Sequence, residues 1–365
     1  MIEINARSMN ILFYQAECGD AARIRFTGND NKPHNIFIDS GFNRTFRHIL
    51  DKEIIAIKKF DEIIDFWIIS HIHDDHIGGV LSYIQSMRDG ELPNLVNSWL
   101  YNPPKIDFVD SSSLEQFSIS EAKSIRQGSI LCQYLRSIGT SINEPITNAL
   151  NPFDLYGMKI TILSPSSKSL DALSEKYTLK TLPIEKIKIS DATSICQNDY
   201  HIPIESFDLT FWEEDNSIEN GSSIAILTEL NNRKILWLAD SFPSIVASKL
   251  KQLGFSKKKP LTCDWIKISH HGSAGNINDE LLEIVKCDNF LLSTNGENKH
   301  CLPNKECIAR IIRNKNRKKS AVINLYFTYD NPTLRNIFKS DGNEVFDKYN
   351  FKVFYNNSKK LEIEI

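Results

Sequence analysis

The sequence lacks the features that would place the protein in a membrane, outside the cell or on a polyanion by charge alone. No apolar run approaches the roughly 20 residues that cross a bilayer. The stretch "MIEINARSMNILFYQAECGD" lacks the charged-then-apolar layout of a secretory signal. The formal net charge of −3 gives no global attraction to nucleic acid or anionic lipid. We therefore expect a cytoplasmic protein with no membrane partner.

The cysteines lack the pattern of a disulfide framework, and two common catalytic motifs are missing. The 7 cysteines are odd in number and scattered, without a CxxC pair. This usage is typical of free thiols in a reducing compartment. The sequence has no GxSxG and no Walker-type phosphate loop, which excludes two competing hydrolase mechanisms.

Short strand-like runs alternate with helical stretches along the chain. Two β-rich runs flank the turn-forming "TGNDNKPH" and predict a hairpin over 22–39. The apolar run "FWIIS" (66–70) is typical of a strand buried on both faces, and a helical pattern follows it over 77–87. Further strands are predicted at 98–103, 158–165, 222–230, 234–240, 265–269, 289–294 and 321–329, and helices at 119–139, 277–287 and 304–313.

The order of these elements predicts a fold class and a domain organisation. Strands in two groups interleaved with helices favour an α/β fold of layered sheets and helices. We expect one domain over 1–365. The polar, irregular segment 166–215 is interpreted as a variable insertion, and 320–365 as extra C-terminal strands.

The stretch "SHIHDDHIGG" (70–79) concentrates three histidines and two aspartates. His71 and His73 are separated by one residue, so an extended backbone points both imidazoles the same way. Asp75 and His76 follow as the chain turns into a helix. Two histidines for one ion and an Asp–His pair for a second suit Zn²⁺, Mn²⁺ or Fe better than Ca²⁺ or Mg²⁺. The alternative is a polar loop with hydrogen-bonded histidines, which this density of ligands disfavours.

The pattern HxHxDH followed by Gly-Gly resembles the signature of the metallo-β-lactamase superfamily. "NIFIDSG" (35–41) is similar to the strand and turn before that motif, and "KILWLAD" (234–240) to the strand whose last aspartate bridges two metals. "DWIKISHHGSAGN" (264–276) resembles a segment of a narrower "HHGS" branch. That branch includes the nuclease-like domain of bacterial DNA-uptake channel proteins, the phosphorylcholine esterases and stand-alone hydrolases, some encoded in bacterial anti-phage operons. The resemblance covers roughly residues 10–313.

The resemblance implies an αββα sandwich of two mixed β-sheets flanked by helices, with two divalent ions, Zn²⁺ or Mn²⁺. The implied metal ligands are His71, His73, Asp75, His76, Asp240, His270 and His271. A bridging role suits Asp240, because an unpaired carboxylate at the end of an apolar strand is costly. His270 and His271 would point to opposite sides of an extended segment, so either could be the ligand. Together with Asp75 they are the expected catalytic residues.

Two departures from the family pattern add further candidates. Many members carry another histidine between the first motif and the bridging aspartate, where this chain has only His201. Asn220 lies in "ENGSSIAIL", at the place of an Asn/Ser-rich strand start in the branch. Relatives often show His-Pro where Leu302 precedes a proline here, so His300 is a candidate substitute. Ser273, after the histidine pair, offers a hydroxyl contact.

The implied reaction is hydrolysis by a metal-activated hydroxide, with a phosphodiester bond as the leading substrate. The leading hypothesis is a phosphodiesterase or nuclease, and the resemblance suggests a role in bacterial anti-phage (antiviral) defence with partner proteins from the same operon. The basic runs "KKK" (257–259) and "RNKNRKK" (313–319) would then contact phosphates, or else form a solvated loop and helix end. Two alternatives stay open: hydrolysis of a small phosphodiester or ester, and a metal-binding scaffold or degenerate enzyme in a defence complex. The oligomeric state is unknown.

Overall fold

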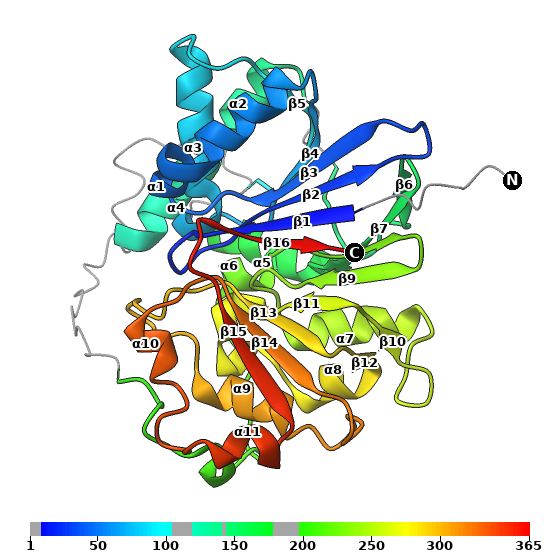
Figure 1. Ribbon diagram of the computed structural model, residues 1–365. Coiled ribbons are helices and arrows are strands. Elements are labelled where there is room, and N and C mark those ends of the chain that lie inside the picture. Colours follow the sequence, from blue (N-terminus) through cyan, green and yellow to red (C-terminus); the bar gives the residue numbers. More distant parts are fainter. Residues whose placement is uncertain (1–8, 104–118, 141–143, 178–196) are drawn as a thin grey trace, which may run out of the picture.

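Two β-sheets pack face to face, and helices cover the outer face of each sheet (Figure 1). The computed structural model describes residues 9–103, 119–140, 144–177 and 197–365. The layers confirm the expected α/β class, an αββα sandwich of two mixed β-sheets flanked by helices. The predicted insertion over 166–215 falls partly outside the described residues, which do not include 178–196.

The first sheet has six strands in the order β16-β1-β2-β3-β4-β5. The predicted hairpin is present as antiparallel β2 and β3, whereas β3, β4 and β5 run parallel. The strands are β1 (Met9–Tyr14), β2 (Ala21–Thr27), β3 (Pro33–Asp39), β4 (Ile64–Ile69), β5 (Val96–Tyr101) and β16 (Lys360–Glu364). The elements on its outer side are α1 (Asn43–Thr45), η1 (Phe46–Leu50), α2 (Asp51–Lys59), α3 (Asp74–Arg88), α4 (Ile119–Ser137) and α5 (Ser167–Tyr177).

The second sheet has eight strands in the order β15-β14-β13-β11-β9-β8-β7-β6. The strands are β6 (Phe153–Leu155), β7 (Met158–Ser164), β8 (Ala225–Leu230), β9 (Arg233–Trp237), β11 (Trp265–Lys267), β13 (Asn289–Leu292), β14 (Ile323–Phe327) and β15 (Phe351–Tyr355). Strands β9, β11, β13, β14 and β15 are parallel, so their carboxyl ends meet at one edge. The helices on its outer side are α7 (Pro243–Gln252), α8 (Asp279–Ile284), α9 (Lys305–Ile312), α10 (Pro332–Arg335) and α11 (Glu344–Lys348).

Apolar side chains fill the space between the sheets because strand residues alternate between faces. Along β2, Ala22, Ile24 and Phe26 face this inner core, while Arg23 turns to the other face and bonds the side chain of Asn35. A short parallel pair, β10 (Leu261–Thr262) and β12 (Val285–Lys286), lies apart from both sheets.

The junction of β4 and α3 brings the "HIHDDH" motif to the edge of the first sheet. Gly79 lies inside α3, where an added Cβ would lie 2.2 Å from the carbonyl oxygen of Ser40. Ser40 also forms two hydrogen bonds to α3: its N–H donates to His76 O at 2.8 Å, and its Oγ accepts from Val80 N at 2.9 Å. The glycine therefore permits a close helix–loop contact, which fixes where α3 begins.

Gly79→Ala is expected to destabilise the fold. The new Cβ must push α3 away from Ser40, and overpacking of this kind costs about 1–3 kcal/mol. Urea unfolding measures the loss. Ser82→Ala in the same helix is the control, because its Oγ makes only a 3.5 Å contact with Gly78 O. Equal unfolding midpoints for Gly79→Ala and the unsubstituted chain would contradict the close-packing explanation.

The cysteines correct the expectation of free thiols at one position. Cys18, Cys263, Cys287 and Cys307 are free thiols. Cys301 is disulfide-bonded, so the prediction of free thiols is wrong at this residue, because counts and spacing do not show which side chains meet. Among the described residues, no helix combines the length and apolarity that a membrane crossing needs.

Candidate metal centre

The predicted ligands meet at one edge of the sandwich, where strands of both sheets end. His71 and His73 follow β4, and His76 lies in the first turn of α3. Asp240 follows β9, and His271 follows β11 in a short turn, η4 (Ser269–Gly272). Each sheet therefore contributes part of the cluster.

One group of ligand atoms comprises His71, His73 and Asp240. His71 Nε2 lies 3.0 Å from His73 Nδ1 and 3.8 Å from Asp240 Oδ2. The ligand atoms of the three residues all lie within 4.8 Å of one another, which is close enough for one divalent ion to contact them after small side-chain rotations.

A second group comprises Asp75, His76, Asp240 and His271. His76 Nε2 lies 3.4 Å from Asp240 Oδ2, and His271 Nε2 lies 3.3 Å from Asp75 Oδ2 and 3.7 Å from Asp240 Oδ1. Asp240, only 1% exposed, belongs to both groups. The arrangement is that of two adjoining sites that share one carboxylate.

Three atoms of the second group are buried without a hydrogen-bond partner. They are His76 Nε2, His271 Nε2 and Asp240 Oδ1. Buried polar atoms are normally satisfied, because leaving one unpaired costs about 1–3 kcal/mol. Two imidazole nitrogens and a carboxylate oxygen in a group whose ligand atoms lie within 4.8 Å of one another match the ligand preferences of Zn²⁺ and similar ions. The residues present therefore fit a bound divalent ion.

The histidine pair does not have the extended backbone that the sequence suggested. His270 (φ 48°) and His271 (φ 55°) are both left-handed, and Gly272 (φ 93°) follows them. This turn brings both imidazoles to the same side: His270 Nε2 also approaches Asp240 Oδ2, at 3.8 Å. The prediction of opposite directions is wrong because it assumed a strand. In the turn it is His271 that joins the second group.

The ring atoms that face away from the cluster have firm partners. His76 Nδ1 lies 2.8 Å from Asp39 Oδ2, and His271 Nδ1 lies 3.0 Å from Ser293 O. Asp39 is held in turn by Ser70 N–H at 2.7 Å. Such contacts fix the ring orientation and leave each Nε2 for a metal. Sequence reasoning assigned Asp39 no role, although it ends the apolar strand "NIFID" as Asp240 ends "KILWLAD".

His270 belongs to a separate polar network beside the cluster. Its Nδ1 lies 3.0 Å from Asn276 Oδ1, 3.4 Å from Asp215 Oδ2 and 3.4 Å from Asn220 Nδ2. Asn220, a predicted candidate, also donates to Asp215 at 2.7 Å, from the short helix α6 (Ile218–Gly221). Asp215 had no sequence signal beyond an acidic run. The network holds His270 with its Nε2 towards Asp240.

The charges of the cluster explain its pKa shifts. Burial and the neighbouring His76 hold the pKa of His71 well below its usual value. Burial alone would also lower the pKa of His271, but Asp240 and Asp20 raise it to about 9. Burial opposes ionisation of Asp240, yet His76 and the consecutive histidines keep its pKa well below the usual value. The carboxylate of Asp240 and the imidazoles around it thus stabilise each other's charged forms, while His71 is held neutral and able to bind a metal ion.

The other predicted candidates lie outside the two ligand groups. His201 is exposed in a turn, and Ser273 is half-buried at the end of η4. His300 is exposed, with its backbone N–H donating to Asn298 Oδ1 at 3.1 Å. Burial and Lys299 lower the pKa of His300. Among the described residues, these three are absent from every group of ligand atoms close enough to share an ion.

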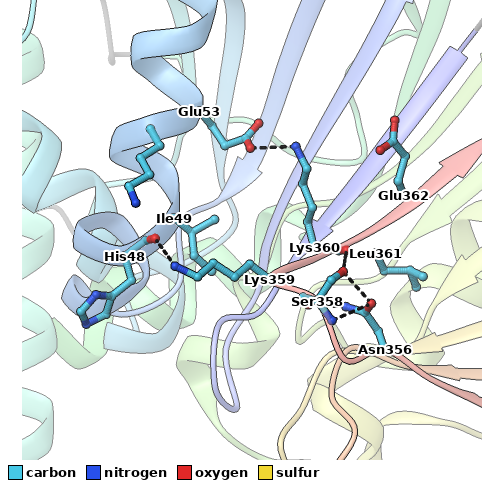
Figure 2. Close-up of a pocket in the computed structure, with 10 residues that line it drawn as sticks. His48, Ile49, Glu53, Asn356, Ser358, Lys359, Lys360, Leu361 and Glu362 are labelled. Carbon is cyan, nitrogen blue, oxygen red and sulfur yellow. Dashed lines mark hydrogen bonds and ion pairs between the residues drawn. The ribbon is translucent and has the colours of Figure 1, made fainter.

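A surface pocket of about 540 Å³ lies away from the cluster, between η1–α2 and the chain leading into β16. Figure 2 shows Lys360 directed at Glu53, 2.9 Å away, and Lys359 directed at the carbonyl of His48, 3.4 Å away. These lysines already have partners within the protein. The pocket contains none of the predicted metal ligands, so we do not connect it with the metal chemistry.

The basic runs precede parallel strands of the second sheet, whereas the cluster follows the carboxyl ends of such strands. Residues 257–259 precede β10 and β11, and 313–319 precede β14, so both runs reach the amino ends of these strands. Asp240 and His271 follow the carboxyl ends of β9 and β11. Lys257 is paired with Glu283 at 2.9 Å. The runs therefore do not border the metal cluster.

Adding Zn²⁺ or Mn²⁺ to metal-free protein is expected to raise its melting temperature. An ion that binds only the folded state stabilises it by about 2.7 kcal/mol when its free concentration is 100 times its Kd. Thermal unfolding in chelator, and then after addition of each ion, measures the shift, with Ca²⁺ as a poorly matched control ion. A melting temperature that none of the ions changes would contradict the assignment of the two groups.

Comparison with known proteins gives distant structural likenesses. The metallo-β-lactamase fold protein YhfI from Bacillus subtilis is 11% identical, with a TM-score of 0.41 over 98% of this chain and 100% of that chain. A long form RNase Z from yeast is 11% identical, with a TM-score of 0.38 over 98% of this chain and 48% of that chain. Zn²⁺-bound PqqB from Methylobacterium extorquens is 11% identical, with a TM-score of 0.39 over 98% of this chain and 100% of that chain.

These likenesses are too distant to support an argument about the chemistry of this chain. No family model matches the sequence, and no curated protein matches it either. The solved structures similar to this chain include a metallo-β-lactamase fold protein, from the superfamily that "HIHDDHIGG" resembles.

Proposed function

We propose that the protein is a metal-dependent hydrolase that cleaves phosphodiester bonds. The observation that carries the proposal is the pair of ligand groups joined by Asp240, with unpartnered buried ligand atoms directed at the second site. Two divalent ions bound there would supply a nucleophile at neutral pH by lowering the pKa of water, and would polarise the bond to be cleaved. The cluster requires no serine or cysteine nucleophile.

The protein's own side chains supply orientation and a proton. Asp75 combines a ligand position with a 23% exposed side chain, so its carboxylate can also orient the attacking water. His270 is 22% exposed at the site, and Asp215 and Asn276 hold its Nδ1. Its Nε2 lies 3.8 Å from Asp240 Oδ2, beside the two ligand groups, where it can bind a substrate oxygen or give a proton to the leaving group.

The choice of substrate rests on two different observations. The "HHGS" segment supports a phosphodiester, and nuclease activity in anti-phage defence is the hypothesis that this resemblance suggests. The position of the basic runs 257–259 and 313–319, away from the cluster, favours a small phosphodiester as the second candidate. Phosphate groups held at those runs would therefore not be the ones next to the metal ligands.

Hydrolysis of bis(p-nitrophenyl) phosphate by protein loaded with Mn²⁺ or Zn²⁺ tests the proposal. We expect turnover that chelator removes and either ion restores. Labelled DNA, RNA and cyclic nucleotides, assayed over a range of salt, then separate a nuclease from a small-molecule hydrolase. If the protein binds two ions per chain but hydrolyses none of these substrates, the phosphodiesterase proposal is wrong and the metal-binding scaffold remains as the alternative.

A further inference from the structure

A buried ion pair lies directly behind the second ligand group. Lys267, the last residue of β11, donates from Nζ to Asp20 and to Ala239 O, the latter at 3.2 Å. The two side chains are only 5% and 8% exposed. Asp20 lies just before β2, so the pair joins the first sheet to the second at the base of the cluster.

The carboxylate of Asp20 approaches two of the metal-binding imidazoles from behind. Asp20 Oδ1 lies 3.4 Å from His271 Nδ1, and Oδ2 lies 4.0 Å from His76 Nδ1. Its backbone is also tied to the cluster, because Asp20 N–H donates to Asp75 O at 3.1 Å. One carboxylate therefore stands behind a histidine from each sheet.

Ordinary ion-pair stabilisation would not require this position, and the chain contains a comparison. Lys305 and Asp341 form another buried pair, 2.5 Å apart and 0% and 3% exposed. Lys305 also contacts Ser340 Oγ at 2.7 Å and Tyr200 O at 3.2 Å. None of these groups is a predicted metal ligand. The two pairs are alike in burial and differ in what the carboxylate faces.

We propose that Asp20 and Lys267 are positioning residues of the metal centre: Lys267 holds the Asp20 carboxylate behind His271, where its negative charge supports the ring orientation that Ser293 O sets, while Asp39 sets the orientation of His76. The inference rests on the proposed function, since it assumes that the second group binds a metal. Carboxylates behind metal-bound imidazoles fix ring orientation and strengthen the ligand, and removing such a partner typically weakens metal affinity about 10- to 100-fold.

Zn²⁺ affinity, measured by competition with a chromophoric chelator, tests the proposal in Asp20→Asn, Lys267→Met, the double variant and Lys305→Met. Co²⁺-loaded protein adds a visible absorption spectrum that reports ligand geometry without any turnover. We expect Asp20→Asn and Lys267→Met each to weaken one of two ions about 10- to 100-fold and to change the Co²⁺ spectrum. Because the two residues act as a unit, the double variant should bind Zn²⁺ no more weakly than the single variant with the lower Zn²⁺ affinity.

Lys305→Met should unfold at a lower temperature and keep the affinity and spectrum of the unsubstituted protein. Unchanged Zn²⁺ affinity and an unchanged Co²⁺ spectrum in Asp20→Asn and Lys267→Met would overturn the inference and leave the proposed function standing. A loss of Zn²⁺ affinity in Lys305→Met equal to that in Lys267→Met would do the same. An unsubstituted protein that binds no ion would overturn both. If Lys267→Met does not fold, the nearly isosteric Asp20→Asn decides the question alone.

Discussion

Asp240→Asn is expected to weaken both metal sites by at least about 100-fold and to abolish metal-dependent hydrolysis. Asp240 is the one residue common to the two ligand groups. Its Oδ2 atom lies 3.8 Å from His71 Nε2 and 3.4 Å from His76 Nε2. Asparagine keeps the shape but removes the charge that offsets two divalent ions, and charge-assisted contacts lose the most when one partner is neutralised. Metal content after dialysis and turnover of the chromogenic diester measure the two effects.

The control for this substitution is Asp264→Asn. Asp264 lies at the amino end of β11, pairs with Arg233 at 2.8 Å and is 24% exposed. The Asp264→Asn variant should retain two metal ions per chain and full turnover. Retention of both ions by Asp240→Asn at unchanged affinity would show that Asp240 does not bridge the sites.

His271→Ala and His270→Ala are expected to separate metal binding from catalysis. His271 Nε2 belongs to the second group, so its loss should reduce the metal content from two ions to one and lower turnover at least about 100-fold. His270 is held by Asp215 and Asn276 beside the cluster, so His270→Ala should keep both ions and lose turnover by about 10²–10⁴-fold, as expected for a proton donor. Metal analysis and kinetics on the same samples distinguish the two.

His201→Ala is the control for both histidine variants, because His201 is exposed in a turn outside the ligand groups. It should match the unsubstituted protein in metal content and rate. Loss of an ion in His270→Ala, with two ions kept in His271→Ala, would reverse the roles assigned here.

Local sequence patterns predicted the layers of the fold and much of the cluster. The apolar run before His71 and the helical pattern after it place the motif at a strand–helix junction, which is where β4 and α3 meet. The turn at His270 and His271 could not be predicted, because a left-handed backbone is rare outside glycine and the neighbouring strand pattern suggested extension. Lys267 and Asp20 are 247 residues apart, so only the packing of the two sheets reveals that they meet.

The return of β16 to the first sheet has a consequence for the order in which the chain can fold during synthesis. β1 and β16 pair antiparallel, with Asn10 opposite Glu364, so β1 lacks this partner until a segment more than 300 residues further along the chain has been made. The histidines after β4 likewise emerge long before Asp240 and His271. Domains are completed during translation only when their distant contacts exist. The nascent chain therefore carries half of the metal centre until it has grown past His271, and an open sheet edge at β1 until β16 has been made.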